Sequence, residues 1–383
     1  KDRVAFYTIV TGENAIPSEI FAAEELSNIL QKISSAKFQI ISENNLDNVS
    51  AKRIYVGWTQ FAEKQGYNLS AFSTDEWLIS TQDDQLLICG GRPRGTLYAA
   101  YEFLAELGYK YFDYYNEIMP QKKELVSKRI NKKGKPYFQE RHIYTQLPEN
   151  ARDQRFRAVM KDTRPKEAKF GFGYGLGTHT FWRYAKNFPP DKPEYLALNA
   201  KGERPVSTSG HGPGQICLTN PGAREHVLQQ VLQEIKEDYE KNALAKDGRE
   251  IKKIYAINQN DIHFICQCPD CQTLSDKEAA DSAAIVDFIN YIADGVKEKY
   301  PDIILESWAY SNTIKAPASI KSRDNVLVRV IQLNGEWSID AIGKKNWSPN
   351  WYPDLFRPRT HPVNAEALNI LQKWGDISSY LGI

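Results

Sequence analysis

The chain has 383 residues, of which 42% are hydrophobic and 25% charged, and its 49 basic and 48 acidic residues leave a net charge of +1. This composition is typical of a globular protein with room for two domains, and it argues against a nucleic-acid partner, which favours clustered basic charge. We find no run of eighteen apolar residues and therefore expect no membrane span.

Residues 1–127 predict a small α+β domain. An amphipathic helix is expected within 16–33, and a second helix lies between Pro93 and Gly108, which are typical residues at helix ends. Strands are expected at 3–10, 37–41 and 52–58, with a hairpin over 76–91. The polar, basic stretch at 128–135 is predicted to be a linker.

From Pro136 to the last residue, strand and helix patterns alternate, which predicts a parallel sheet. Strands are expected at 140–145, 168–174, 215–218, 252–258, 303–309, 325–332 and 378–383, and helices at 150–161, 221–241, 279–299 and 363–374. This alternation predicts a (β/α)8 TIM-type barrel over 136–383. A doubly wound open sheet is the competitor, but no G-x-G-x-x-G motif follows the first strand. Because the seventh strand coincides with the end of the chain, we expect the C-terminal part of the barrel to be missing here.

Four polar residues, Asn258 to Asp261, end the fourth barrel strand, and active sites of such barrels lie at the carboxyl ends of strands. Side chains alternate along a strand, so Gln259 and Asp261 should point one way and Asn258 and Asn260 the other. We predict that Gln259 binds substrate and that Asp261 is catalytic, with a pKa raised by partial burial. An ordinary strand-to-loop turn is the structural alternative.

Glu306, Trp308 and Tyr310 share one face near the end of the fifth strand. A buried carboxylate needs a partner or a function, so Glu306 is the second catalytic candidate and Arg329 its possible ion-pair partner. Trp308 and Tyr310 are candidates for substrate binding, or else for the core.

Three further side chains are predicted to bind substrate. Arg141 starts the first barrel strand and suits a clamp on hydroxyls or a carboxylate, with a structural ion pair as the alternative. His179 follows a glycine-rich stretch, and Asn220 either contacts substrate or caps the next helix. The long loop at 333–362 contains three tryptophans and is expected to form outer sugar subsites.

The chain has five cysteines, three of them in a C-x-C-x-x-C cluster at 266–271. A zinc site with His263 as the fourth ligand is one interpretation; reduced packing thiols or one local disulfide are the others. Cys89 and Cys217 are isolated and are expected to act as small buried hydrophobes. We assign no metal ligand and no cofactor at this stage.

The stretch "LLICGGRPRGTLYAAYEFLAELGYKYF" resembles the end of the small domain that precedes the catalytic barrel in α-glucuronidases and β-hexosaminidases. The stretches "QICLTNP", "YAINQNDIHFICQCPDC" and "FINYIADGVKEKYPDIILESWAYSNT" resemble the domain of unknown function 4838, which is common in gut Bacteroidetes. Part of that domain has been classed as glycoside hydrolase family 163. The resemblance implies an endo-β-N-acetylglucosaminidase that acts on glycans of complex-type N-glycoproteins outside the cytoplasm, in the periplasm or at the cell surface.

The resemblance also implies an acetamido-assisted retaining mechanism, an exception to the scheme with two protein carboxylates. The N-acetyl carbonyl of the substrate attacks the anomeric carbon, an acid protonates the leaving oxygen, and a polar group orients the acetamide. Where β-hexosaminidases have Asp-Glu, this chain has Asn260-Asp261, so Asp261 fits either role and the second carboxylate is Glu306 or lies beyond residue 383. Arg141 matches their sugar-binding arginine by position only.

Two alternatives stay open. An α-glucuronidase-like inverting hydrolase needs two carboxyl groups about 6.5–9.5 Å apart and a cation for the substrate carboxylate, such as Arg141 or Arg329. A non-catalytic carbohydrate-binding protein on a degenerate barrel needs neither.

Overall fold

The structure, a computed structural model, has a mixed α/β fold that divides into two compact units. Unit 1 comprises Lys1–Gly175 and Glu240–Ile251, and unit 2 comprises Leu176–Tyr239 and Lys252–Ile383. The domain boundary predicted at 128–135 stays a prediction. The residues described are 3–46, 52–113, 115–126, 128–138, 141–142, 151–163, 167–171, 177–243, 252–331, 338–339, 345–346 and 362–382.

Unit 1 is built on a six-stranded sheet with the order β10-β6-β7-β5-β2-β4. The strands are β2 (Tyr7–Thr11), β4 (Ile40–Ser42), β5 (Lys52–Val56), β6 (Trp77–Gln82), β7 (Gln85–Gly90) and β10 (Asn131–Gly134). β2 pairs in parallel with β4 and β5, and β5 with β7, whereas β6 is antiparallel to β7 and β10. The predicted β6–β7 hairpin is therefore confirmed. Short pairs complete the unit: β1 (Arg3–Val4) with β3 (Ala36–Lys37), and β8 (Lys110–Tyr111) with β9 (Glu117–Ile118).

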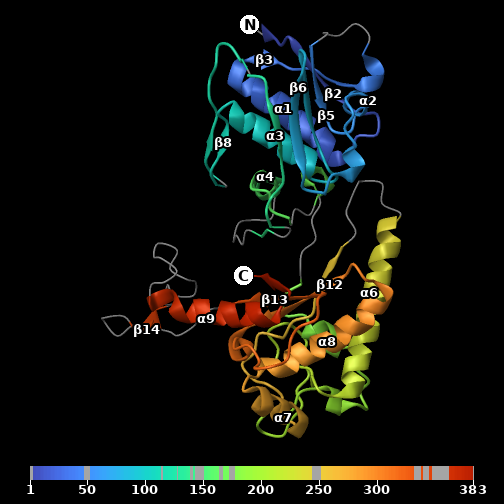
Figure 1. The fold of residues 1–383 in the computed structure, drawn as a ribbon, viewed down its shortest axis with the longest axis vertical. Helices are drawn as coiled ribbons and strands as arrows, with labels where there is room; N and C mark the ends of the chain where they lie inside the picture. The colour runs from blue at the N-terminus through green and yellow to red at the C-terminus, as the bar shows by residue number, and fades with distance from the viewer. Residues whose placement is uncertain are drawn as a thin grey trace. The chain divides into compact units, whose positions relative to one another are not determined.

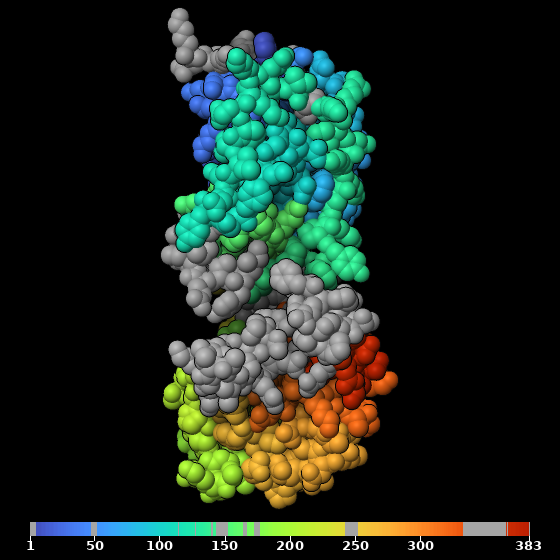
Figure 2. All heavy atoms as spheres, turned by 90° about the vertical axis from the view of Figure 1, so that its left-hand side faces the viewer, coloured from blue at the N-terminus to red at the C-terminus, as the bar shows by residue number. Residues whose placement is uncertain are grey.

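Helices cover this sheet because its side chains alternate between two apolar faces. α1 (Pro17–Ser34) and α3 (Gly95–Glu106) lie side by side and share a core with Ile9, Ile54 and Ile88 (Figure 1). The other face packs its own apolar residues against α2 (Gln60–Lys64) and the 3-10 turn η2 (Leu69–Ala71). Teal residues of α3 and the segment after it form much of the face of this unit seen in Figure 2. The unit also contains α4 (Ala151–Val159) and the turns η1 (Glu43–Asn45) and η3 (Ala168–Phe170).

Unit 2 contains a parallel four-stranded sheet with the order β11-β12-β13-β16. The strands are β11 (Ile254–Ala256), β12 (Ile304–Ala309), β13 (Val326–Val330) and β16 (Tyr380–Gly382), which confirms four of the predicted strands at slightly shorter lengths. The sheet is open over the described residues, and no closed eight-stranded barrel is seen in that part of the chain.

Two predicted barrel strands are not seen as regular strands in the described residues, and a third is not tested. Most of 140–145 lies outside the described residues. In 168–174, the described part forms the 3-10 turn η3, because its chain turns at Gly171 with a left-handed φ of 86°. The segment 215–218 makes only a single antiparallel bridge, between Ile216 and Leu196.

The described helices of unit 2 are α5 (Phe181–Ala185), α6 (Pro221–Ala243, in this unit up to Tyr239), α7 (Pro269–Glu278), α8 (Ser282–Lys299) and α9 (Pro362–Ile377). α6, α7 and α9 each begin with proline, which suits a position whose N–H has no helical partner. α7 was not predicted. Unit 2 also contains the short turns η4 (Pro193–Tyr195) and η5 (Ser311–Thr313). The strands β14 (Ser338–Ile339) and β15 (Lys345–Asn346) form an antiparallel pair. The tryptophans of the 333–362 loop, with its predicted subsites, lie outside the described residues.

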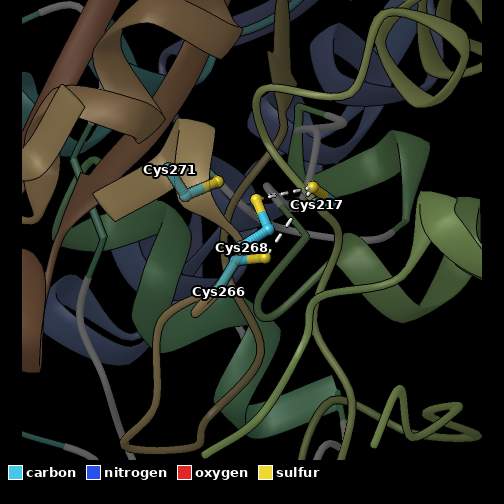
Figure 3. Close-up of side chains that lie close together, drawn as sticks. All are labelled: Cys217, Cys266, Cys268 and Cys271. Atoms are coloured by element: carbon cyan, nitrogen blue, oxygen red, sulfur yellow. Dashed lines mark hydrogen bonds between the residues drawn. The ribbon is translucent and has the colours of Figure 1, made fainter. Parts of the chain in front are cut away.

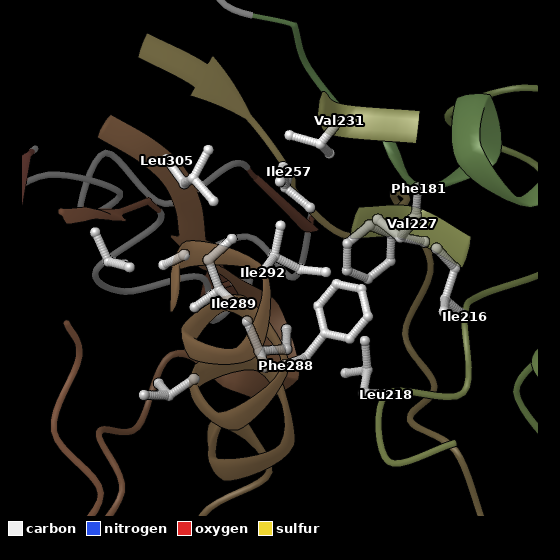
Figure 4. Packing of buried hydrophobic residues seen from close by; sticks show 14 of the residues in the cluster. Phe181, Ile216, Leu218, Val227, Val231, Ile257, Phe288, Ile289, Ile292 and Leu305 are labelled. Atoms are coloured by element: carbon white, nitrogen blue, oxygen red, sulfur yellow. The ribbon is translucent and has the colours of Figure 1, made fainter. Parts of the chain in front are cut away.

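The core of unit 2 joins α6 and α8 to the sheet (Figure 4). Phe288 and Ile292 of α8 are fully buried, as are Val227 of α6 and Leu305 of β12. The ring of Phe288 meets that of Phe181 edge-on at 5.8 Å. Burial of each such side chain stabilises the fold by about 1.5–3 kcal/mol, so this core fixes the strands whose carboxyl ends carry the candidate site. No described helix has the length and apolar character needed to cross a membrane.

Candidate functional site

The amide of Asn258 ties the end of β11 to the segment that precedes α5. Asn258 Oδ1 accepts from the Thr180 N–H at 2.9 Å, and its Nδ2 donates to the Gly177 carbonyl at 3.1 Å. The side chain is completely buried, so both of its polar ends need these partners. Asn258 is therefore a clamp between two segments.

Asn260 contacts the same 177–182 segment and also a second one, the loop that ends at Gly214. Its Oδ1 accepts from the Trp182 N–H at 3.1 Å, and its Nδ2 donates to the Gly214 carbonyl at 2.8 Å. Gln215 completes the arrangement, since its side-chain amide bonds both the N–H and the carbonyl of Asn260 at 3.0 Å. The loop that ends at Gly214 is thus fixed beside β11.

Gln259 points to the other side, toward the end of β12. Its Nε2 donates to the Tyr310 carbonyl at 2.9 Å, and its Oε1 accepts from Thr313 Oγ1 at 2.9 Å. The predicted alternation is confirmed, because Gln259 and Asp261 both reach Tyr310 while Asn258 and Asn260 reach the 177–182 segment. Gln259 is 5% exposed and its amide is engaged at both ends, so it positions the β12 loop; its predicted contact with substrate stays a prediction.

Asp261 is the only carboxylate in this polar stretch, and its side chain keeps 32% exposure. The Tyr310 hydroxyl donates to Asp261 Oδ1, and His211 Nδ1 lies 3.2 Å from Oδ2. The backbone N–H of Asp261 donates to the Gly210 carbonyl at 2.7 Å, which fixes the residue in the chain. Asp261 therefore joins loops from three parts of unit 2 while remaining open to solvent.

The pKa of the Asp261 carboxyl is lowered from its ordinary value. Burial raises this pKa, but the Tyr310 hydrogen bond and the imidazoles of His179 and His211 outweigh burial. The raised pKa expected from the sequence is thus wrong, because partial burial was the only influence visible there. The arrangement favours a carboxylate that stays ionised near neutral pH rather than one that holds a proton.

A group of aromatic rings reaches this carboxylate through Tyr310 and His211. His179 meets Trp308 edge-on at 5.0 Å and Tyr310 at 5.8 Å, and its Nδ1 lies 3.0 Å from the Gln259 carbonyl. His179 has a left-handed φ of 50°, which is uncommon for residues other than glycine and is held here by these contacts. The structure thus brings together four of the residues named as site candidates, His179, Trp308, Tyr310 and Asp261, and we call them the Asp261 cluster.

Glu306 lies beneath Trp308 in β12 and is 1% exposed. Its Oε1 accepts from Arg329 Nε at 2.6 Å and from Trp308 Nε1 at 2.9 Å. The ion pair that the sequence suggested is confirmed, and β13 supplies it because Arg329 stands opposite Trp308 in the parallel register. Glu306 holds Trp308 in place through this contact; its catalytic role stays a prediction.

Arg141 and Asn220 lie outside the Asp261 cluster. Arg141 belongs to unit 1, where it donates to Asp75 at 3.0 Å and to the Lys161 carbonyl at 2.6 Å. Asn220 caps α6, since its Oδ1 accepts from the Ala223 N–H at 3.0 Å. The structural alternatives named for both residues, an ion pair and a helix cap, are therefore observed.

His211 was missed by the sequence analysis. It lies in the stretch "SGHGPG" at 209–214, and its ring is 5.5 Å from that of His179. Gly210 is needed beside it, because a Cβ there would stand 2.7 Å from His179 Cβ. The sequence feature that could have indicated His211 is its position between closely spaced glycines, in a loop that returns to the sheet.

The cysteines also differ from expectation. His263 Nδ1 lies 2.7 Å from Ser311 Oγ and is not among the grouped ligand atoms of the described residues. Cys217 is buried as expected, but it also meets the cysteines of the C-x-C-x-x-C segment, which its isolated place in the sequence did not indicate. Cys217 and the cysteines at 266–271 lie close together because α6 packs beside β11. Their spacing in the sequence does not show this.

These features define a mixed α/β protein with an ionised carboxylate and aromatic side chains at the carboxyl ends of neighbouring parallel strands. Residues 111–383 match the family described as "Domain of unknown function (DUF4838)", and the chain belongs to that family. Comparison with curated proteins gives no match.

Three solved structures illustrate what the chain is similar to. A family GH115 4-O-methyl-α-glucuronidase with specificity for decorated arabinogalactans has 14% identity and a TM-score of 0.48, covering 84% of this chain and 45% of its own. The β-N-acetylhexosaminidase from Bacteroides fragilis has 12% identity and a TM-score of 0.44, and the match covers 97% of this chain and 70% of that protein. A mutant β-hexosaminidase from Streptomyces plicatus has 9% identity and a TM-score of 0.41, and the match covers 97% of this chain and 69% of that protein. This chain thus spans less than half the length of the first.

Proposed function

We propose that this chain is a glycoside hydrolase of the endo-β-N-acetylglucosaminidase type that cleaves complex N-glycans by an acetamido-assisted retaining mechanism. The observation that carries the proposal is the Asp261 carboxylate after β11, which accepts from the Tyr310 hydroxyl, lies against the His211 imidazole and has a pKa lowered by both of these and by His179. The family resemblance described from the sequence supplies the substrate class.

In this proposal Asp261 orients the acetamide of the substrate and does not act as the acid. A carboxylate with a lowered pKa accepts a hydrogen bond from the acetamide N–H and stabilises the positive charge that develops on the acetamide during attack. An acid must arrive protonated, which the surroundings of Asp261 oppose. The acid is therefore Glu306, after a change in its contact with Arg329, or a carboxyl group outside the described residues.

Trp308 and His179 give the proposed sugar site its apolar part. The C–H face of a pyranose packs on aromatic rings, and these two rings stand edge to face, both next to the Tyr310 ring whose hydroxyl donates to Asp261. Glu306 fixes the indole through Trp308 Nε1, so the ring is held before substrate arrives. A fixed ring lowers the ordering cost of binding.

The proposal extends to fold and compartment. β11, β12, β13 and β16 are then four consecutive strands of a (β/α)8 barrel whose catalytic end carries the Asp261 cluster. The protein acts in the periplasm or at the cell surface, where host glycans are met. Cell fractionation tests the compartment, and recovery of the protein only in the cytosol contradicts it.

The experiment incubates the full chain with a complex-type N-glycoprotein, sialylated and desialylated, and detects released glycans by mass spectrometry. We expect release by the unaltered protein and a fall of about 100-fold or more in Asp261→Asn, because one stabilising group for developing charge has that effect. Asp191→Asn is the matched control, since Asp191 is an exposed carboxylate elsewhere in unit 2.

Three outcomes contradict parts of the proposal. Unchanged release by Asp261→Asn removes Asp261 from the mechanism. Glycan binding without release by any form supports the carbohydrate-binding alternative. Release of glucuronic acid from a glucuronic acid-containing polysaccharide, with none from the glycoprotein, supports the inverting alternative.

A further inference from the structure

Four buried cysteine side chains meet in unit 2, away from the groups used in the proposed mechanism. Figure 3 shows the four thiols directed toward a common point. We call them the four-cysteine cluster, and its members are Cys217, Cys266, Cys268 and Cys271, each at most 8% exposed. Cys217 lies just before α6, and the other three lie where the chain from β11 enters α7.

The distances within the cluster fit one metal ion. A tetrahedral zinc with zinc–sulfur bonds of about 2.3 Å places its sulfur atoms about 3.8 Å apart, which is the edge of that tetrahedron. Cys217 Sγ lies 3.6 Å from Cys268 Sγ and 3.7 Å from Cys266 Sγ. All four sulfur atoms lie within 4.8 Å of one another, so the space between them holds a single ion.

A disulfide does not explain the cluster. A disulfide brings two sulfur atoms to about 2.05 Å and joins them in pairs, whereas all four cysteines here are free. Cys217 faces two sulfur atoms at nearly equal distances, which is an arrangement around a centre and not a pairing.

The surroundings of the cluster suit thiolates. The Leu198 N–H donates to Cys266 Sγ at 3.2 Å, and Thr219 Oγ1 lies 3.1 Å from Cys271 Sγ. Donors of this kind orient metal ligands and stabilise their charge. Ala197, Leu198 and Phe264 pack around the cluster and keep water away from it.

We propose that the four-cysteine cluster binds one zinc ion in a closed, structural site. Four protein ligands complete the coordination of zinc and leave no position for water or substrate, so the ion has no part in hydrolysis. Zinc instead joins the segment before α6 to the segment after β11. Asp261 lies five residues before Cys266, and the ion therefore anchors the loop that carries it.

Metal analysis of the full chain tests the site. The protein is purified without chelators or metal-affinity resin, dialysed, and assayed by mass spectrometry of its metals. We expect about one zinc per chain, because the cluster supplies one full ligand set. Cys271→Ala should lower the zinc content at least tenfold. Cys89→Ala is the control and should keep it, since Cys89 is a buried cysteine of β7 in unit 1.

Two further measurements do not depend on how Cys271→Ala folds. Replacement of zinc by Co²⁺ in the unaltered protein should give the visible bands of a tetrahedral tetrathiolate centre. A chelator should lower the melting temperature of the unaltered protein and of Cys89→Ala alike, because metal binding is coupled to folding. A zinc content near zero, stoichiometric iron in place of zinc, or disulfide-linked cluster peptides would each overturn the proposal. These results do not depend on glycan release.

Discussion

The ion pair between Glu306 and Arg329 gives a prediction that separates a structural role from a catalytic one. The Glu306 side chain is 2% exposed and that of Arg329 is 20% exposed. Arg329→Met removes the charge that faces Glu306 and leaves a carboxylate in the interior. Loss of one partner of a buried pair costs about 3–5 kcal/mol, so we expect the free energy of unfolding of unit 2 to fall by that amount.

The reverse change should be milder. Glu306→Gln keeps an oxygen that accepts from Trp308 Nε1, and Arg329 retains access to water, so we expect a loss of about 1–3 kcal/mol. The double variant removes both charges and should be more stable than Arg329→Met alone, because no uncompensated charge is then buried. This non-additivity is the signature of the pair.

Hydrogen exchange of the β12 and β13 amides, followed by mass spectrometry, is the suitable assay, since the chain has two compact units and a global transition reports on both. A change below about 0.5 kcal/mol in Arg329→Met, which is the size of an ordinary surface substitution, would refute the reasoning.

Two predictions concern Asp261 and the Asn220 cap of α6. Ionised Asp261 has a folded-state pKa below its unfolded value of about 3.9, so it stabilises the fold above that pH and loses this effect as the pH falls through the lower folded-state value. The melting temperatures of the unaltered protein and Asp261→Asn should therefore differ at pH 7 and converge in acid; a constant difference contradicts the lowered pKa. Asn220→Ala should cost about 1 kcal/mol through loss of the α6 cap, whereas Asn220→Asp keeps the acceptor and most of the stability, as thermal unfolding will show.

Local patterns predicted much of what surrounds Asp261. Side-chain alternation after Ile257 correctly divided Gln259 and Asp261 from the two asparagines, because a strand direction persists for a few residues beyond its last ladder bond. The pairing of Glu306 with Arg329 followed from two neighbouring parallel strands.

Contacts between distant segments were not predictable in the same way. Cys217 and the 266–271 cysteines are separated by α6 and β11, and only the packed structure shows that they meet. The Asp261 pKa is lowered by the Tyr310 hydrogen bond, by His179 and by His211, and the last of these comes from a loop without periodic pattern. Arg141 was placed by analogy of position, and its guanidinium lies in unit 1 beside Asp75.

The three buried amides at the end of β11 have a consequence for how this family can diversify. Asn258, Gln259 and Asn260 each make two side-chain hydrogen bonds, and together they hold the roots of three loops, at 177–182, 310–313 and Gly214. The outer portions of those loops can lengthen, shorten or change composition while their points of departure stay in register. New recognition surfaces can thus arise around an unmoved Asp261, because the tripeptide 258–260 fixes the points where the loops begin.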